Sequence, residues 1–227
     1  MTSDTSYYLA SITKMYTAVV DLQLAREGTL DLAAPIGDYL PSELAGGLHV
    51  VDGTDRGPAI TVEQLLFQTS GLADYFAGKH KGEPSLEEAL NAGSDRALTI
   101  EDISALARTL RPRFAPGAGG ARKAHYSDTN YALLGEIIAA VTGVPVAAAF
   151  AQRIFGPLSL QDTFVFDHTQ SQPTPAVVWH KDVALDIPLA MSSFPADGGI
   201  VATLGDSLRF LRGFLAASCC PKLSWPT

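Results

Sequence analysis

A serine and a lysine lie one helical turn apart near the start of the sequence, at Ser11 and Lys14. Apolar residues then recur at helical spacing: Met15, Ala18, Val19 and Leu22. This pattern predicts an amphipathic helix from about Ser11 to Arg26, with Gly28 as its C-terminal stop. Because residues three apart share a helix face, the Lys14 amine can stand beside the Ser11 hydroxyl. The positive end of the helix dipole at Ser11 favours an alkoxide-like nucleophile.

The Ser11–Lys14 spacing has a specific chemical use. A serine is a weak nucleophile near neutral pH unless a base removes its proton. A lysine in an apolar, partly desolvated pocket can lose its charge and act as that base. The S-x-x-K signature is therefore typical of serine acyl-transfer enzymes. The same spacing also suits a helix cap followed by a solvated lysine, so the interpretation depends on a second element.

A tyrosine before another predicted helix supplies that element. Tyr126 follows a glycine-rich segment at 116–120, and apolar residues at helical spacing begin at Tyr131, with Asp128 or Thr129 as the expected N-cap. A free tyrosine, with a pKa of about 10, is too weakly acidic to act as a base at neutral pH, but a neighbouring lysine ammonium stabilises the phenolate. A Ser-Lys-Tyr cluster can then carry one proton from nucleophile to leaving group. The alternative is a tyrosine that only packs ahead of the helix.

With both elements present, the chain resembles the serine β-lactamase-related family. This family includes class C β-lactamases, D-alanyl-D-alanine carboxypeptidases and esterases of the same fold. The segments that carry the resemblance occur in family order over nearly the whole chain, at 9–15, 27–32, 39–41, 65–72, 114–117, 126–131, 133–135, 156–158 and 198–203.

The resemblance implies a fold and roles for five residues. The expected fold class is α+β, β-lactamase/transpeptidase-like, as a single partial domain over residues 1–227 in which the helical lobe dominates and much of the antiparallel sheet is missing. Ser11 would be the nucleophile, Lys14 and Tyr126 the general acid/base pair, and Ser127 and Asp128 would bind substrate. The chain is expected to be truncated at both ends, and residues 219–227, with Cys219 and Cys220, to form an irregular or non-native tail.

Three departures from the family pattern bear on activity. The family's third motif is a triplet of Lys or His, then Thr or Ser, then Gly, and no such triplet follows Tyr131. In this fold the motif lies on a late strand that supplies one oxyanion donor. Loss of such a donor typically lowers the rate by ~10²–10³. Asp128 stands where many relatives carry Asn. The negative charge of the aspartate is unfavourable for anionic β-lactams and more tolerant of neutral esters. Gln68 replaces a common His in a segment that we expect to be structural.

Composition excludes several classes of function. A formal net charge of −8 argues against binding to nucleic acid or to anionic membranes. The five histidines are scattered and the two cysteines adjacent, so neither a metal site nor a cofactor is expected. Residues 131–151 are apolar, but Glu136, Gly143 and Pro145 interrupt them, which predicts two buried helices rather than a membrane span. One basic cluster is either a solvated loop or a rim that attracts a substrate carboxylate: Arg111, Arg113, Arg122 and Lys123.

These observations predict a serine hydrolase that works through an acyl-enzyme on Ser11, most simply a carboxylesterase. Its partner would be a small-molecule ester, amide or β-lactam. The alternatives are a non-catalytic scaffold or fragment that serves binding or assembly, and a helical interaction module with chance motifs. Apolar surface left uncovered by the missing strands would favour self-association. The first residues lack a signal-peptide pattern, which indicates the cytoplasm only if the start is genuine, so localisation is left open.

Overall fold

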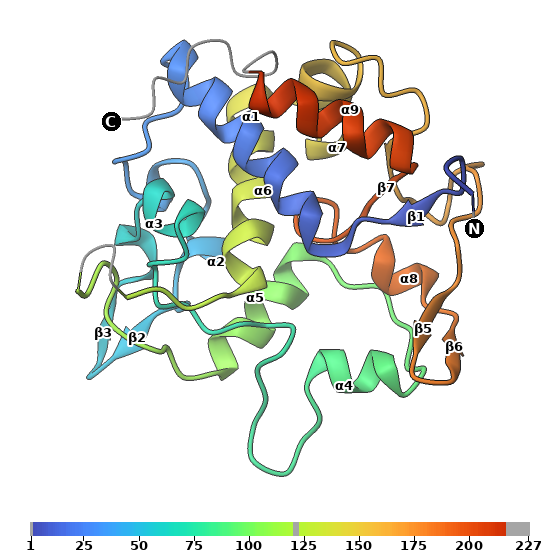
Figure 1. Cartoon of the computed structure of the whole chain (residues 1–227). Helices are drawn as coiled ribbons and strands as arrows, with labels where there is room; N and C mark the ends of the chain where they lie inside the picture. The colour runs from blue at the N-terminus through green and yellow to red at the C-terminus, as the bar shows by residue number, and fades with distance from the viewer. Residues whose placement is uncertain (1, 120–122, 217–227) are drawn as a thin grey trace.

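A long central helix and a small sheet beside its N-terminus organise the molecule. The computed structural model describes residues 2–119 and 123–216. Helix α1 (Thr13–Glu27) crosses the centre against α6 (Asp128–Thr142) (Figure 1). The antiparallel sheet has the strand order β1-β7-β4, from Tyr7–Tyr8, Ile200–Ala202 and Phe164–Val165, with Tyr7 opposite Ala202 and Val165 opposite Ile200. Strand β1 therefore ties the entry to α1 to a segment almost 200 residues later.

The remaining elements are short and mostly helical. Two hairpins are formed by β2 with β3 (Val50–Val51 and Thr54–Asp55) and by β5 with β6 (Val178–His180 and Val183–Leu185). The further helices are α2 (Ser42–Ala45), α3 (Val62–Leu66), α4 (Leu86–Asn91), α5 (Ile100–Thr109), α7 (Val146–Phe150), α8 (Pro188–Met191) and α9 (Leu204–Leu215). A π-helical turn, Ala151–Phe155, continues α7, and 3₁₀ turns lie at Ile36–Asp38 and Gly57–Ala59. The predicted α+β class is confirmed.

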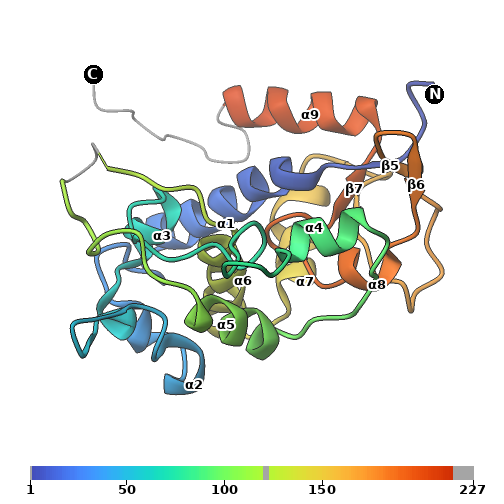
Figure 2. The same ribbon diagram turned by 90° about the horizontal axis from the view of Figure 1, so that it is seen from below.

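The helix predicted around Ser11 is confirmed, but its predicted apolar face is only partly the buried one. A 3₁₀ turn, Ala10–Ile12, precedes α1, and Gly28 ends the helix in the left-handed conformation with φ 75°. Among the apolar and aromatic residues of α1, Tyr16, Val19 and Val20 have no exposure. Of the predicted face, Val19 is thus fully buried, whereas Met15, Ala18 and Leu22 are only partly buried. The reason is that α1 is enclosed from several sides. Helices α6 and α7 contact it, and α9 lies along it in Figure 2. The ring of Phe210, from α9, stacks on the ring of Tyr16 with centres 3.7 Å apart.

Side-chain caps begin two of the other helices, and one predicted helix boundary is wrong. Thr61 and Thr99 cap α3 and α5 through complete capping boxes. The N-cap of α6 is Ser127, not Asp128 or Thr129. Ser127 makes no side-chain cap, because its hydroxyl donates to the carbonyl of Ala73 at 3.0 Å.

The apolar stretch after Tyr131 forms two helices that meet at an angle. Helix α6 and the pair α7 with its π-turn are bent by 75° at the break between them. None of the described helices is by itself long and apolar enough to cross a membrane, and this bent pair passes that test only when the two are joined. Residues 219–227, with Cys219 and Cys220, lie outside the described residues.

Candidate active site

Ser11 lies exposed in the 3₁₀ turn between β1 and α1. The preceding residue, Ala10, has φ +47°, a left-handed conformation that is uncommon for a residue with a Cβ atom. The turn places the Ser11 amide within the first helical turn, where backbone N–H groups have no intrahelical partner. The Ser11 N–H is therefore a candidate donor to an oxyanion that forms at its own hydroxyl.

Lys14 reaches Ser11 from the next turn and keeps its proton. Its Nζ lies 3.3 Å from Ser11 Oγ, 2.7 Å from the carbonyl oxygen of Asp197 and 2.5 Å from Asp128 Oδ1. Burial lowers the pKa of Lys14, but the charges of Asp128 and Asp197 outweigh burial and the pKa lies above its usual range. The site thus presents an ammonium group beside the nucleophile, not the uncharged amine that desolvation alone would give.

Tyr126 completes the predicted group of three. Its hydroxyl donates to Ser11 Oγ at 2.8 Å, and half of the residue remains exposed. Lys14 Nζ lies 5.2 Å from the centre of the Tyr126 ring. The two sequence motifs, more than 100 residues apart, therefore meet at one hydroxyl oxygen.

Gln68 braces the segment that carries Tyr126. Its Oε1 accepts from the amide of Ser127 at 3.0 Å and from the side-chain amide of Asn130, and its carbonyl accepts from the amide of His125 at 2.9 Å. Gln68 itself has φ +59°. Sequence reasoning gave this residue a structural role only. The structure shows that the role bears directly on the site, because Gln68 fixes the backbone on both sides of Tyr126.

Asp197, which sequence reasoning missed, closes the site from the other side. Its carbonyl accepts from Lys14, and its carboxylate, nearly buried, accepts from the hydroxyl of Tyr75 at 2.7 Å. Burial raises the pKa of Asp197 to about 7, opposed by the charge of Lys14. The segment approaches closely because α6 carries Gly135, where a Cβ atom would lie 2.5 Å from that of Ala196. The only signal in the sequence was the position of Asp197 next to the Gly198–Gly199 segment.

The two predicted substrate-binding residues lie in different surroundings. Asp128 pairs with Lys14 and lines the cavity beside Ser11. Its amide donates to Asp74 Oδ1 at 3.1 Å, and burial together with the Asp128 charge raises the pKa of Asp74. Ser127 has no exposed surface, donates its hydroxyl to Ala73 and is not among the residues that line this cavity.

The cavity beside Ser11 has a volume of about 220 Å³ and is mainly apolar. Its apolar walls come from α4 and the segment before it, the β5–β6 hairpin and the segment around α8: Phe76, Leu90, Val178, Leu185, Ile187, Met191 and Phe194. The charged groups in the lining are Glu87, Asp128 and Asp197, and none of the described lining residues is Lys or Arg. Arg111, Arg113 and Lys123 do not line it, and Arg122 lies outside the described residues. Among the described lining residues, carboxyl groups are thus the only charged side chains of the cavity.

Known proteins are similar to this chain in sequence and fold. The family model described as Beta-lactamase matches residues 1–218. Penicillin-binding protein 4 of Amycolatopsis lactamdurans is 26% identical over 97% of this chain and 54% of its own length, and esterase EstB of Burkholderia gladioli is 32% identical over 71% of this chain and 39% of its own. The crystal structure of a D-stereospecific amidohydrolase from Streptomyces sp. superposes with a TM-score of 0.77 at 31% identity, over 96% of this chain and 63% of that one.

These comparisons cover the chain almost from end to end, while the chain spans only about half the length of the curated relatives it matches. The superposition with the amidohydrolase covers nearly all of the chain. Sequence and architecture lead to one assignment: this chain belongs to the Beta-lactamase family of serine hydrolase-like proteins.

Proposed function

We propose that this protein is a serine hydrolase that forms an acyl-enzyme on Ser11 and acts on small, uncharged carboxylic esters. The observation that carries the proposal is the convergence on Ser11 Oγ of the Tyr126 hydroxyl at 2.8 Å and the Lys14 ammonium at 3.3 Å. A hydroxyl nucleophile needs a group that takes its proton and a charge that stabilises the resulting anion. Both lie within hydrogen-bond reach.

Because Lys14 holds its proton, Tyr126 is the acceptor in this proposal. The Lys14 ammonium provides the counter-charge that a Tyr126 phenolate needs. For this step Tyr126 must first have released to solvent the proton with which it donates to Ser11 Oγ in the structure. As Ser11 Oγ bonds to the ester carbonyl carbon, its proton then passes to the Tyr126 phenolate oxygen. When the carbon–oxygen bond to the alcohol breaks, that proton goes to the departing alkoxide. Water then attacks the acyl carbon, giving one proton to Tyr126, and Ser11 Oγ recovers this proton as the acid leaves.

The charges in the cavity support an ester substrate over a β-lactam. Penicillins and peptide C-termini carry a carboxylate, whereas the described lining residues include Glu87, Asp128 and Asp197 and no Lys or Arg. The Lys14 ammonium beside Ser11 is already paired with Asp128. Carboxylates in the lining therefore disfavour binding of a further carboxylate. Amides without a carboxylate are the second candidate, since the Streptomyces protein of similar structure is described as a D-stereospecific amidohydrolase.

The intact mass of the protein tests the proposal directly. The protein is exposed to a reactive phosphonate and, separately, to a penicillin, with Ser11→Ala treated in parallel. We expect a phosphonate adduct in the wild type only and little or no penicillin adduct. A penicillin adduct that depends on Ser11 would favour the cell-wall peptidases instead. If folded protein forms no adduct with either reagent, Ser11 is not a reactive nucleophile, and the result favours a non-catalytic scaffold.

A further inference from the structure

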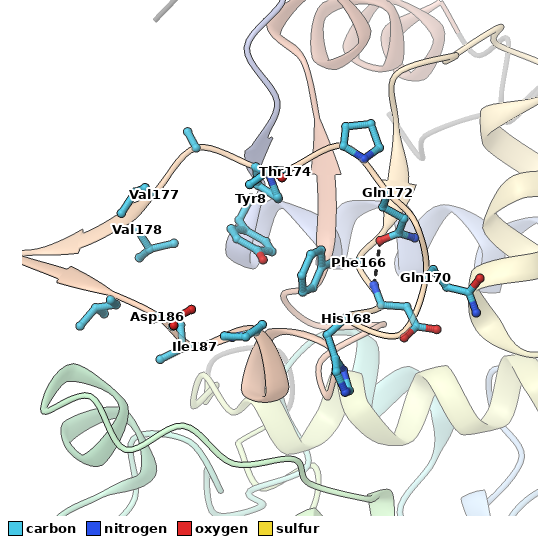
Figure 3. A pocket seen from close by; sticks show the side chains of 16 residues that line it. Tyr8, Phe166, His168, Gln170, Gln172, Thr174, Val177, Val178, Asp186 and Ile187 are labelled. Atoms are coloured by element: carbon cyan, nitrogen blue, oxygen red, sulfur yellow. Dashed lines mark hydrogen bonds between the residues drawn. The ribbon is translucent and has the colours of Figure 1, made fainter.

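A second and larger cavity adjoins the one beside Ser11. It has a volume of about 410 Å³ and lies between the end of β1, the loop around 166–177 and the β5–β6 hairpin (Figure 3). Val178, Leu185 and Ile187 line both cavities. The two cavities are therefore neighbours that share an apolar wall. Val178 and Leu185 of the hairpin and Ile187, two residues after the hairpin, form this wall.

Chain geometry keeps this second cavity near the nucleophile. Tyr8, which lines it, stands three residues before Ser11, so the two Cα atoms lie within about 11 Å of each other. The wall between the cavities rests on a two-stranded hairpin that pairs with no other strand of the described chain. A two-stranded hairpin contributes little stability by itself, so its shared side chains can yield to a substrate that extends beyond the first cavity.

The lining indicates an apolar, uncharged ligand. Tyr8 and Phe166 pack edge to face with ring centres 5.2 Å apart and lie next to each other in Figure 3. Both are only partly buried, and Pro173, Pro175 and Val177 extend the apolar surface. Aromatic walls of this kind bury large apolar area and leave ring edges and faces for a further ring or an alkyl chain.

Polar groups in the second cavity refine the ligand class. The lining includes two carboxylates, Asp167 and the exposed Asp186, and one histidine, His168, while none of the described lining residues is Lys or Arg. This set of charges disfavours an anionic group. The Tyr8 hydroxyl has no hydrogen-bond partner among the described residues and is available to a carbonyl or ether oxygen. Burial and the charge of Asp95 raise the pKa of Tyr8 to about 12, which keeps this hydroxyl a donor at physiological pH.

We infer that this second cavity, the Tyr8–Phe166 cavity, is an accessory subsite that binds an apolar, uncharged part of the substrate, an aromatic ring or alkyl chain, while the ester carbonyl lies at Ser11. The inference rests on the proposed function, because it assigns the subsite to the substrate of that site. It makes Phe166 and Ala176, which line this cavity but not the first, determinants of specificity.

Esters of graded length test the inference. One series varies the acyl chain of p-nitrophenyl esters from acetate to octanoate and phenylacetate, and a second varies the alcohol of acetate esters. Phe166→Ala removes an aromatic wall, and Ala176→Phe fills the space without removing packing. We expect kcat/KM for p-nitrophenyl acetate to stay within about twofold of wild type, and kcat/KM for the long or aromatic esters of at least one series to fall about tenfold or more in both variants.

The control variant is Val183→Ala, on the same hairpin. Val183 is exposed and lines neither cavity, so its truncation should leave both ester series unchanged. The inference is overturned if the wild type shows no preference for longer esters, or if the cavity variants lower kcat/KM for every ester equally.

A binding measurement separates failure of the subsite from failure of the proposed function. The neutral fluorescent probe N-phenyl-1-naphthylamine is titrated into Ser11→Ala protein, alone and combined with each substitution. We expect binding to weaken about tenfold with Phe166→Ala and Ala176→Phe and to persist with Val183→Ala. Equal binding by all variants overturns the cavity as a ligand site even if esters are hydrolysed. Absence of any Ser11-dependent turnover or phosphonate adduct refutes the proposed function itself, and with it the substrate role of the cavity.

Discussion

The carboxylate of Asp128 lies 2.5 Å from the ammonium of Lys14, and the two side chains are 13% and 8% exposed. This nearly buried ion pair fixes the charge state of the site, because Asp128 raises the pKa of Lys14 against the effect of burial. The same carboxylate also opposes the formation of any further anion nearby. Asp128 thus influences both the cation and the proton acceptor beside Ser11.

Asp128→Asn should move the pH profile of kcat/KM to lower pH on both limbs. Loss of the negative charge makes the base beside Ser11 easier to form, which shifts the acidic limb downward. It also removes the partner that raises the pKa of Lys14, so Lys14 loses its proton at lower pH and the basic limb follows. The measurement is kcat/KM for a neutral ester across pH, with Glu87→Gln, on the same cavity wall, as the control. An unmoved profile, or a shift to higher pH, would contradict this role of Asp128.

Lys14→Ala and Tyr126→Phe should each lower kcat by a factor of about 10²–10⁴, as removal of an acid, base or stabilising charge usually does. The control is Tyr131→Phe. The Tyr131 ring also lies near Lys14, at 5.8 Å, but its hydroxyl donates to the carbonyl of Leu66, so less than a tenfold loss is expected. Turnover of Tyr126→Phe close to wild type would remove Tyr126 from the proposed proton path.

Gln68→Ala should destabilise the protein by about 1–3 kcal/mol and lower kcat more than it raises KM. The substitution leaves the Ser127 amide and the Asn130 side-chain amide without their acceptor, and both lie in the segment that positions Tyr126. Urea denaturation and ester kinetics measure the two effects.

The left-handed backbone of Gln68, with φ +59°, requires a matched control for that substitution. Gln68→Gly also removes the acceptor but adopts this conformation without strain. The difference in stability between the Gly and Ala variants therefore reports backbone strain, and the deficit of Gln68→Gly relative to wild type reports the lost hydrogen bonds. A Gly variant as stable and as active as wild type would show that the side chain does not brace the Tyr126 segment.

The grouping of Ser11, Lys14 and Tyr126 was predictable because its signals are local. Ser11 and Lys14 are linked by one helical turn, and Tyr126 stands directly before a helix whose apolar pattern is plain in the sequence. The helices that begin after Thr61 and Thr99 were predictable for the same reason, since a capping box is complete within four residues.

Features that depend on distant partners were not predictable from the sequence. The buried face of α1 is set by α6, α7 and Phe210, and no spacing within α1 encodes their positions. The charge state of Lys14 follows from Asp128 and Asp197, which come from two other parts of the chain. Asp197 shows the limit most clearly: its carbonyl reaches Lys14 only because Gly135 leaves room for the segment that carries it.

Replacing two leucines on α9 should reduce self-association. Leu204, Leu208, Leu211 and Leu215 recur on one helix face and are 39% to 80% exposed. Apolar patches of this kind mark interfaces or sites of aggregation. Light scattering should show a smaller average mass for Leu208→Gln with Leu211→Gln than for wild type at equal concentration. Val50→Thr, an exposed substitution on another surface, is the control, and a wild type that is already monomeric would contradict the prediction.

Asp21→Asn should stabilise the protein above neutral pH. Asp21 is fully buried in α1, neither of its carboxylate oxygens has a hydrogen-bond partner among the described residues, and burial raises its pKa well above the usual range. The folded chain therefore holds a proton that the unfolded chain releases near pH 4, so this residue lowers stability increasingly as pH rises from about 4 toward its folded pKa, by up to ~1.4 kcal/mol per pH unit. An amide carries no such penalty.

Urea denaturation across pH measures this effect. We expect the free energy of unfolding of Asp21→Asn to exceed that of wild type by about 1–3 kcal/mol at pH 8, and the difference to close toward pH 4. Asp182→Asn, at an exposed position, should follow the wild-type pH dependence. A gap that stays constant with pH would show that packing, rather than ionisation of Asp21, separates the two proteins.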